Sequence, residues 1–145
     1  MNAVNNVVAA LGLDVGSKRI GVAGCDRLGM FAHGITTIVR KSWQEDMAQL
    51  QALVSDREVT TLVVGLPYNM DGSLGYQAKQ VQKFARGASK HLGLALEYVD
   101  ERLTSFEAEQ IMQSQGFSPR ENKGMIDRKA AALILQQWLD RRRDR

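Results

Sequence analysis

Runs of apolar residues separated by short turns dominate the first third of the chain. Apolar and β-branched residues fill residues 7–16, 20–26 and 35–39, with polar or glycine-containing turns between these segments. Such runs, bounded by turn residues, are typical of β-strands. Three consecutive strands with short connections predict an antiparallel meander.

Helical spacing first appears after residue 41. Ser42 and Glu45 have the capping-box pattern, which marks the start of a helix. Apolar residues then follow at helical intervals: Trp43, Met47, Leu50 and Val54. The short, almost wholly apolar segment 60–67 predicts a strand that is covered on both faces. A second helix is expected from about residue 75 to 91, with Gly93 as its stop signal.

The last third continues this alternation of strand and helix. Residues 94–99 predict a fifth strand, and a second capping box at residues 104–107 predicts a helix that ends near Gly116. The polar residues 118–124 are expected to form a mobile loop before a last helix over about residues 125–142. A hairpin-rich start followed by strand–helix alternation predicts an α/β fold, with a mixed five-stranded sheet and helices on both faces.

Length and composition favour one cytoplasmic domain over residues 1–145. The chain is 44% hydrophobic and 24% charged, close to the average for globular proteins. The single cysteine, Cys25, excludes an internal disulfide and a thiolate metal cage. The first ten residues lack the basic start and apolar stretch of a secretory signal. No run approaches the roughly 18 apolar residues that a membrane helix needs.

The net charge of +3 conceals an uneven distribution. Residues 118–145 contain eight basic and four acidic residues, whereas residues 1–117 contain eleven basic and twelve acidic residues. This asymmetry predicts an anionic partner that is met locally, not a uniformly basic nucleic-acid surface.

Asp14 is the first candidate for chemistry, because strand interiors disfavour aspartate. Its neighbours two positions away, Gly12 and Gly16, have no side chains. We interpret this patch as room for a metal ion, its waters and an approaching phosphate. The alternative is that Asp14 caps a turn or pairs with Lys18 or Arg19.

Further acids follow the fifth strand and begin the last helix. Asp100 and Glu101 come at a strand end, where catalytic groups of such sheets tend to collect. They point to opposite faces, so only one of them is expected to meet Asp14. Asp127 shares a helical stripe with apolar residues that are predicted to face the sheet. The alternatives are a solvated acidic turn for the pair and a helix-dipole interaction for Asp127.

This set of acids favours hard cations. His33 and His91 are interpreted as an ordinary strand residue and a helix-end residue, which leaves no histidine or thiolate cluster. Carboxylates alone suit Mg²⁺ or Mn²⁺. Two such ions, held about 4 Å apart, can activate a water and stabilise the leaving oxygen in phosphodiester hydrolysis.

Four segments, in order along nearly the whole chain, resemble the YqgF/RuvX family: LDVGSKRIGVA (13–23), GLPYNMDG (65–72), DERLTSFEA (100–108) and DRKAAALILQQWL (127–139). This is a family of Holliday-junction-resolvase-like proteins and of nucleases that process the 5′ end of pre-16S rRNA. The resemblance implies an RNase H-like fold, with the first catalytic and metal-binding acid at Asp14, a second in the DER segment and a third at Asp127.

The fourth strand departs from RNase H-like nucleases in general, which often place an acid at its end. Here it ends in Gly65, Leu66 and Pro67, so the second acid must come from the fifth strand. Glu101 is preferred to Asp100 because its longer side chain reaches further across the gap between strands.

Substrate phosphates are expected to meet residues near each acid and in the turn after the fourth strand: Lys18, Arg19, Asn69, Arg102, Lys123 and Arg128. The alternatives are local charge balancing for the basic residues and simple turn chemistry for Asn69.

We therefore expect a metal-dependent nuclease, an endonuclease that binds nucleic acid and processes the 5′ end of pre-16S rRNA during ribosome biogenesis. Two alternatives remain open: a resolvase of Holliday junctions or other branched DNA, and a nucleic-acid-binding module without catalysis. The sequence is compatible with a monomer or a homodimer.

Overall fold

The computed structural model describes residues 7–101, 110, 114 and 123–143. Its strands and helices follow the order β1 (Ala10–Val15), β2 (Arg19–Cys25), β3 (Ala32–Val39), α1 (Trp43–Arg57), β4 (Thr61–Leu66), α2 (Tyr76–Leu92), β5 (Ala95–Asp100) and α4 (Lys123–Arg143). The strands, α2 and α4 end within three residues of their predicted bounds, and α1 begins where its capping box predicted. The helix expected from residue 104 to Gly116 and most of the loop expected at residues 118–124 lie outside the described residues.

The five strands form one mixed sheet in the order β3-β2-β1-β4-β5. Strands β1, β2 and β3 are antiparallel neighbours, as the predicted meander requires. Strand β4 pairs in parallel with β1, and β5 pairs in parallel with β4. The carboxyl ends of β1, β4 and β5 therefore meet at one edge of the sheet.

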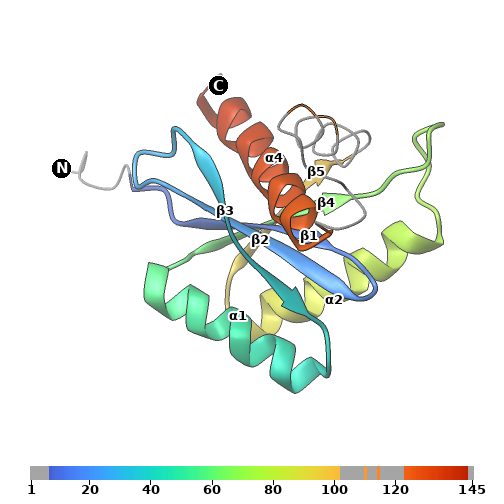
Figure 1. Ribbon diagram of the computed structural model, residues 1–145, viewed down its shortest axis with the longest axis horizontal. Coiled ribbons are helices and arrows are strands. Elements are labelled where there is room, and N and C mark those ends of the chain that lie inside the picture. The colour runs from blue at the N-terminus through green and yellow to red at the C-terminus, as the bar shows by residue number, and fades with distance from the viewer. Residues whose placement is uncertain (1–6, 102–109, 111–113, 115–122, 144–145) are drawn as a thin grey trace.

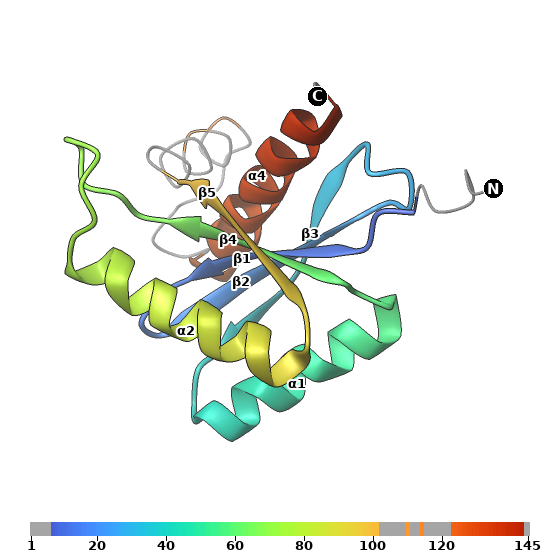
Figure 2. The same cartoon turned by 180° about the vertical axis from the view of Figure 1, so that it is seen from behind.

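Helices cover both faces of the sheet, which confirms the predicted architecture. Helix α4 lies on one side, and α1 and α2 lie on the other (Figures 1 and 2). Alternate residues of β1 divide between two cores: Leu11, Leu13 and Val15 pack with α1 and α2, whereas Ala10 packs with α4. The side chain of Asp14 consequently belongs to the α4 face.

Local capping signals fix the ends of α1 and α2. The Ser42 hydroxyl accepts a hydrogen bond from the backbone N–H of Glu45 at 3.1 Å, as the capping box predicts. Gly93 ends α2 in the left-handed conformation, with φ of 70°, as a stop signal should. None of the described helices is both long and apolar enough to cross a membrane.

Two element boundaries differ from the prediction because of contacts distant in sequence. Helix α4 begins at Lys123, and the Gly124 carbonyl accepts a hydrogen bond from the Thr37 hydroxyl at 2.6 Å. Lys123 and Gly124 therefore belong to the helix, not to the predicted loop. Strand β3 begins at Ala32, whose N–H donates to the Gln136 side chain of α4 at 2.8 Å.

Helix α4 approaches the sheet closely over glycines. A Cβ at Gly12 would lie 2.7 Å from Leu135 Cβ and 2.8 Å from the Ala131 carbonyl oxygen. A Cβ at Gly21 would overlap the backbone carbonyl of Asp127. Helix α4 therefore fills the space above Gly12. The interpretation that the bare surface at Gly12 leaves room for a metal ion and its waters is wrong.

The variant Gly21→Ala tests this close approach. The added methyl group meets helix backbone, which cannot rotate away, so we expect a loss of about 3 kcal/mol in the free energy of unfolding, measured in urea. Gly124→Ala is the matched control, since its Cβ would meet Thr37 Oγ1 at an ordinary 3.6 Å. Alanine should stabilise that helical position by about 0.5 kcal/mol. Equal stabilities for the two variants would contradict the contact.

Candidate active site

Asp14 lies one residue before the end of β1, on the face covered by α4. Its partner across the antiparallel pair is Gly21 of β2, where the backbone of Asp127 approaches most closely. Strand pairing and helix packing together place these two acids over the same point of the sheet. They are 113 positions apart in sequence, and tertiary structure alone brings them near one another.

Glu101 directly follows β5, and its side chain reaches Asp14 from the β4 and β5 side of the sheet. Its backbone N–H donates to the Leu66 carbonyl at 3.0 Å, which holds it against the end of β4. Its carboxyl group forms a side-chain hydrogen bond with that of Asp14. Asp100 is the last residue of β5 and is exposed. Of the two adjacent acids, Glu101 is therefore the one that meets Asp14.

Asp127 lies in the second turn of α4, and its carboxylate is engaged by Arg19. The Arg19 Nε donates to Asp127 Oδ2 at 2.6 Å, and both side chains are partly buried. The negative charge of Asp127 still acts on Asp14, whose pKa it raises. Within the residues that the structure describes, no three His, Cys, Asp or Glu side chains form a ready-made metal site. Asp14 and Glu101 are joined directly, and Asp127 lies beside them in an ion pair.

Burial controls the electrostatics of the carboxyl pair. Burial, aided by the nearby charges of Asp14 and Asp100, raises the pKa of Glu101 to about 9. Burial likewise raises the pKa of Asp14 to about 6, although its hydrogen bond with Glu101 opposes the change. At neutral pH the pair therefore holds about one proton between its two members.

One carboxylate oxygen marks where a cation fits. Glu101 Oε2 is buried and has no hydrogen-bond partner among the described residues. A buried carboxylate needs a proton, a donor or a cation to offset its loss of hydration. Oxygen donors of this kind suit Mg²⁺ or Mn²⁺. The donor set thus fits a hard divalent cation at Asp14 and Glu101, with Asp127 beside them and one of its oxygens bonded to Arg19.

Two glycines shape this site and were not assigned that role from the sequence. Gly21 admits the backbone of Asp127. A Cβ at Gly65 would lie 2.5 Å from Ile134 Cδ1 and 2.9 Å from Glu101 Oε2. Both glycines occur inside otherwise apolar strands, where glycine often marks close approach of another group. That signal was available in the sequence.

The expected phosphate-binding residues have varied surroundings. Lys18 and Lys123 are exposed, whereas Arg128 Nη1 donates to Thr37 Oγ1 at 3.2 Å and so ties α4 to β3. The Asn69 amide donates to Ser73 Oγ at 3.0 Å, which supports a turn role. Arg102 lies outside the described residues. Phosphate binding by these residues remains a prediction.

Comparison with known proteins identifies relatives along almost the whole chain. Residues 8–141 match the model of the RuvX family, described as "Holliday junction resolvase". A protein of Trichormus variabilis named "Putative pre-16S rRNA nuclease" is 65% identical over 136 residues, which cover 94% of this chain and 90% of that protein. A protein of the same name from Synechococcus elongatus is 63% identical and covers 94% and 91% of the two chains.

Solved structures show the same fold at low sequence identity. RuvC of Thermus thermophilus in complex with a Holliday junction substrate superposes with a TM-score of 0.59 at 15% identity, covering 94% of this chain and 96% of that one. RuvC of the same organism in a second structure gives a TM-score of 0.55 at 13% identity, covering 93% and 96%. The chain therefore has the RNase H-like fold that its sequence resemblance implied.

The raised pKa values predict how the stability of the metal-free protein depends on pH. Asp14 and Glu101 retain protons in the folded chain that the unfolded chain has already released near pH 4. Folding stability should therefore fall as pH rises from about 4 to about 9. In Glu101→Gln, the part of this fall above about pH 7 should be reduced.

Urea unfolding in a chelating buffer at several pH values measures this effect. Glu97→Gln is the control, because Glu97 is exposed on the same strand and should keep the wild-type dependence on pH. A Glu101→Gln profile parallel to that of the wild type would mean that Glu101 is not the buried, protonated member of the pair.

Proposed function

The chain belongs to the RuvX family, and on that premise we propose that it is a metal-dependent endonuclease that processes the 5′ end of precursor 16S rRNA. The substrate comes from the names of relatives that are more than 60% identical. Such an enzyme works where ribosomes are assembled, so the proposal places it in the cytoplasm, and its partner is nucleic acid.

One observation supports the proposal most strongly: the carboxyl groups of Asp14 and Glu101 share a buried site at the edge where three parallel strands end. A purely structural pair of acids would be costly there, because burying two carboxylates without a cation destabilises the fold. The pair makes physical sense when its charge is used to bind a cation and position a phosphodiester.

Asp14, Glu101 and Asp127 would hold one or two Mg²⁺ or Mn²⁺ ions. Such ions neutralise phosphate charge and lower the pKa of a water nucleophile. The chain itself supplies the buried setting, which strengthens each electrostatic interaction. Arg19 keeps a positive charge beside the acids and, once parted from Asp127, could bind a substrate phosphate through its planar guanidinium.

A resolvase of branched DNA is the second candidate. The description of the matched family as "Holliday junction resolvase" favours it, and the chemistry of phosphodiester hydrolysis is the same. The two candidates differ in the shape and sugar of the nucleic acid, which a direct comparison of substrates distinguishes.

Side-by-side cleavage tests the proposed function. We expect purified protein with Mn²⁺ or Mg²⁺ to cut a 5′-extended 16S rRNA precursor faster than a four-way DNA junction. Asp14→Asn should slow cleavage about a thousand-fold, as the loss of several kcal/mol of electrostatic stabilisation implies. Glu97→Gln should cut at the wild-type rate. Faster cutting of the junction would favour the resolvase, and cutting of neither substrate would favour a binding module.

Thermal denaturation tests the metal site independently of activity. Millimolar Mn²⁺ or Mg²⁺ should raise the melting temperature of the wild type by mass action, because the ion binds only the folded acids. Asp14→Asn should reduce that increase, whereas Glu97→Gln should keep it. Equal increases in the wild type and Asp14→Asn would place the cation elsewhere.

A further inference from the structure

A second candidate site lies on the opposite face of the sheet from the acids. It is a cavity of about 650 Å³ between the end of β1 and the helices α1 and α2. We call it the aromatic pocket and define it by the lining residues Val15, Arg40, Trp43, Tyr76, Lys83 and Phe84. Val15 directly follows Asp14, so the pocket and the acids lie on opposite faces at the same end of β1.

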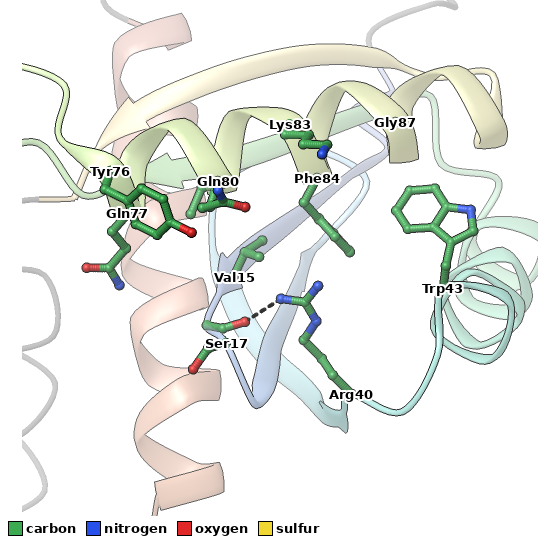
Figure 3. A pocket seen from close by; sticks show the side chains of 12 residues that line it. Val15, Ser17, Arg40, Trp43, Tyr76, Gln77, Gln80, Lys83, Phe84 and Gly87 are labelled. Atoms are coloured by element: carbon green, nitrogen blue, oxygen red, sulfur yellow. Dashed lines mark hydrogen bonds between the residues drawn. The ribbon is translucent and has the colours of Figure 1, made fainter.

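Aromatic rings in the pocket are available to a ligand. Figure 3 shows Tyr76 and Trp43 at opposite ends, with Phe84 and Arg40 between them. Trp43 is 43% exposed and Tyr76 is 80% exposed. The Trp43 ring stands edge-on to Phe84 at 5.5 Å between centroids, and it covers Gly87, where a Cβ would lie 2.9 Å from Trp43 Cη2. Trp43 is therefore held in place while it remains exposed.

Positive charge accompanies these rings. The Arg40 guanidinium lies 4.8 Å from the centroid of Phe84 and donates to the Gly16 carbonyl at 2.7 Å. Asp46 balances part of its charge, at 3.8 Å from Arg40 Nε. Lys83 is exposed and forms no ion pair with the described residues. No Asp or Glu is present among the lining residues that the structure describes.

This combination matches the chemistry of a nucleotide. Exposed aromatic rings stack on bases of any sequence, and an unbalanced lysine attracts a phosphate. Because the described lining residues include no Asp or Glu, they would not repel the phosphate. A purely apolar ligand would gain nothing from Lys83, and an acidic peptide would gain little from two separated rings.

We propose that the aromatic pocket binds a single-stranded segment of the RNA substrate, with a base on Trp43 or Tyr76 and a phosphate near Lys83. This inference rests on the proposed function for the identity of the ligand. The turn at residues 16–18 joins the two sites, and Arg40 fixes it through the Gly16 carbonyl. A strand of RNA that passes over this turn would touch both faces of the sheet, which would align the scissile bond.

Binding without cleavage provides the test. In a Trp138→Phe background, Trp43 is the only tryptophan, because the chain has two. Adding an oligoadenylate RNA of ten nucleotides in a chelating buffer should quench the fluorescence of Trp43 in a saturable manner. Tyr76→Ala should weaken the affinity about five- to hundred-fold, as the loss of base stacking does elsewhere. Its 80% exposure means that the variant should fold.

The salt dependence separates a phosphate contact from a general loss of structure. Lys83→Gln should lower the slope of log affinity against log salt by about 0.7, the value for one contact to a single strand. Lys90→Gln is the matched control, an exposed lysine on the same helix that does not line the pocket. It should leave both affinity and slope unchanged.

Two outcomes would overturn the proposal. Unchanged affinity in both Tyr76→Ala and Lys83→Gln would leave the pocket to a protein partner. Binding of adenosine monophosphate as tight as that of the oligomer would assign it to a free nucleotide. Because binding is measured without metal, an inactive protein could still bind RNA here, and an active nuclease could still fail to do so. Failure of this inference is therefore distinct from failure of the proposed function.

Discussion

Helix α4 approaches β1 and β2 so closely that a side chain added at Gly12 or Gly21 would strike the helix. Gly12 and Gly21 permit this approach, and they lie beside or opposite Asp14 in the sheet. The same contact brings Asp127 to the sheet and leaves the acids only partly exposed to solvent. The glycines therefore determine both the packing of α4 and the surroundings of the proposed catalytic group.

Partial burial of two carboxyl groups beneath a helix has an energetic consequence. Burial raises the pKa of both Asp14 and Glu101. At neutral pH the folded chain without metal therefore keeps a proton that the unfolded chain has released. Glu101 Oε2 remains without a partner among the described residues. These buried carboxyl groups lower the free energy of unfolding, as is common for groups that serve function instead of stability.

Alternation along β1 separates two kinds of recognition. Asp14 faces α4 and the other acids, whereas Val15 faces α1, α2 and the aromatic pocket. One face offers negative charge that suits cations, and the other offers aromatic rings with positive charge that suit nucleotides. A single strand end can thus organise both, because successive side chains point to opposite faces.

The sequence by itself determined the element order, the mixed sheet and the caps at Ser42 and Gly93, because periodicity and capping are local. It also determined which acids merit attention. Only tertiary structure decided that Glu101, and not Asp100, meets Asp14, since this depends on the register of β5 against β4. The ion pair between Arg19 and Asp127 likewise joins groups 108 residues apart, and no local pattern records a contact over that distance.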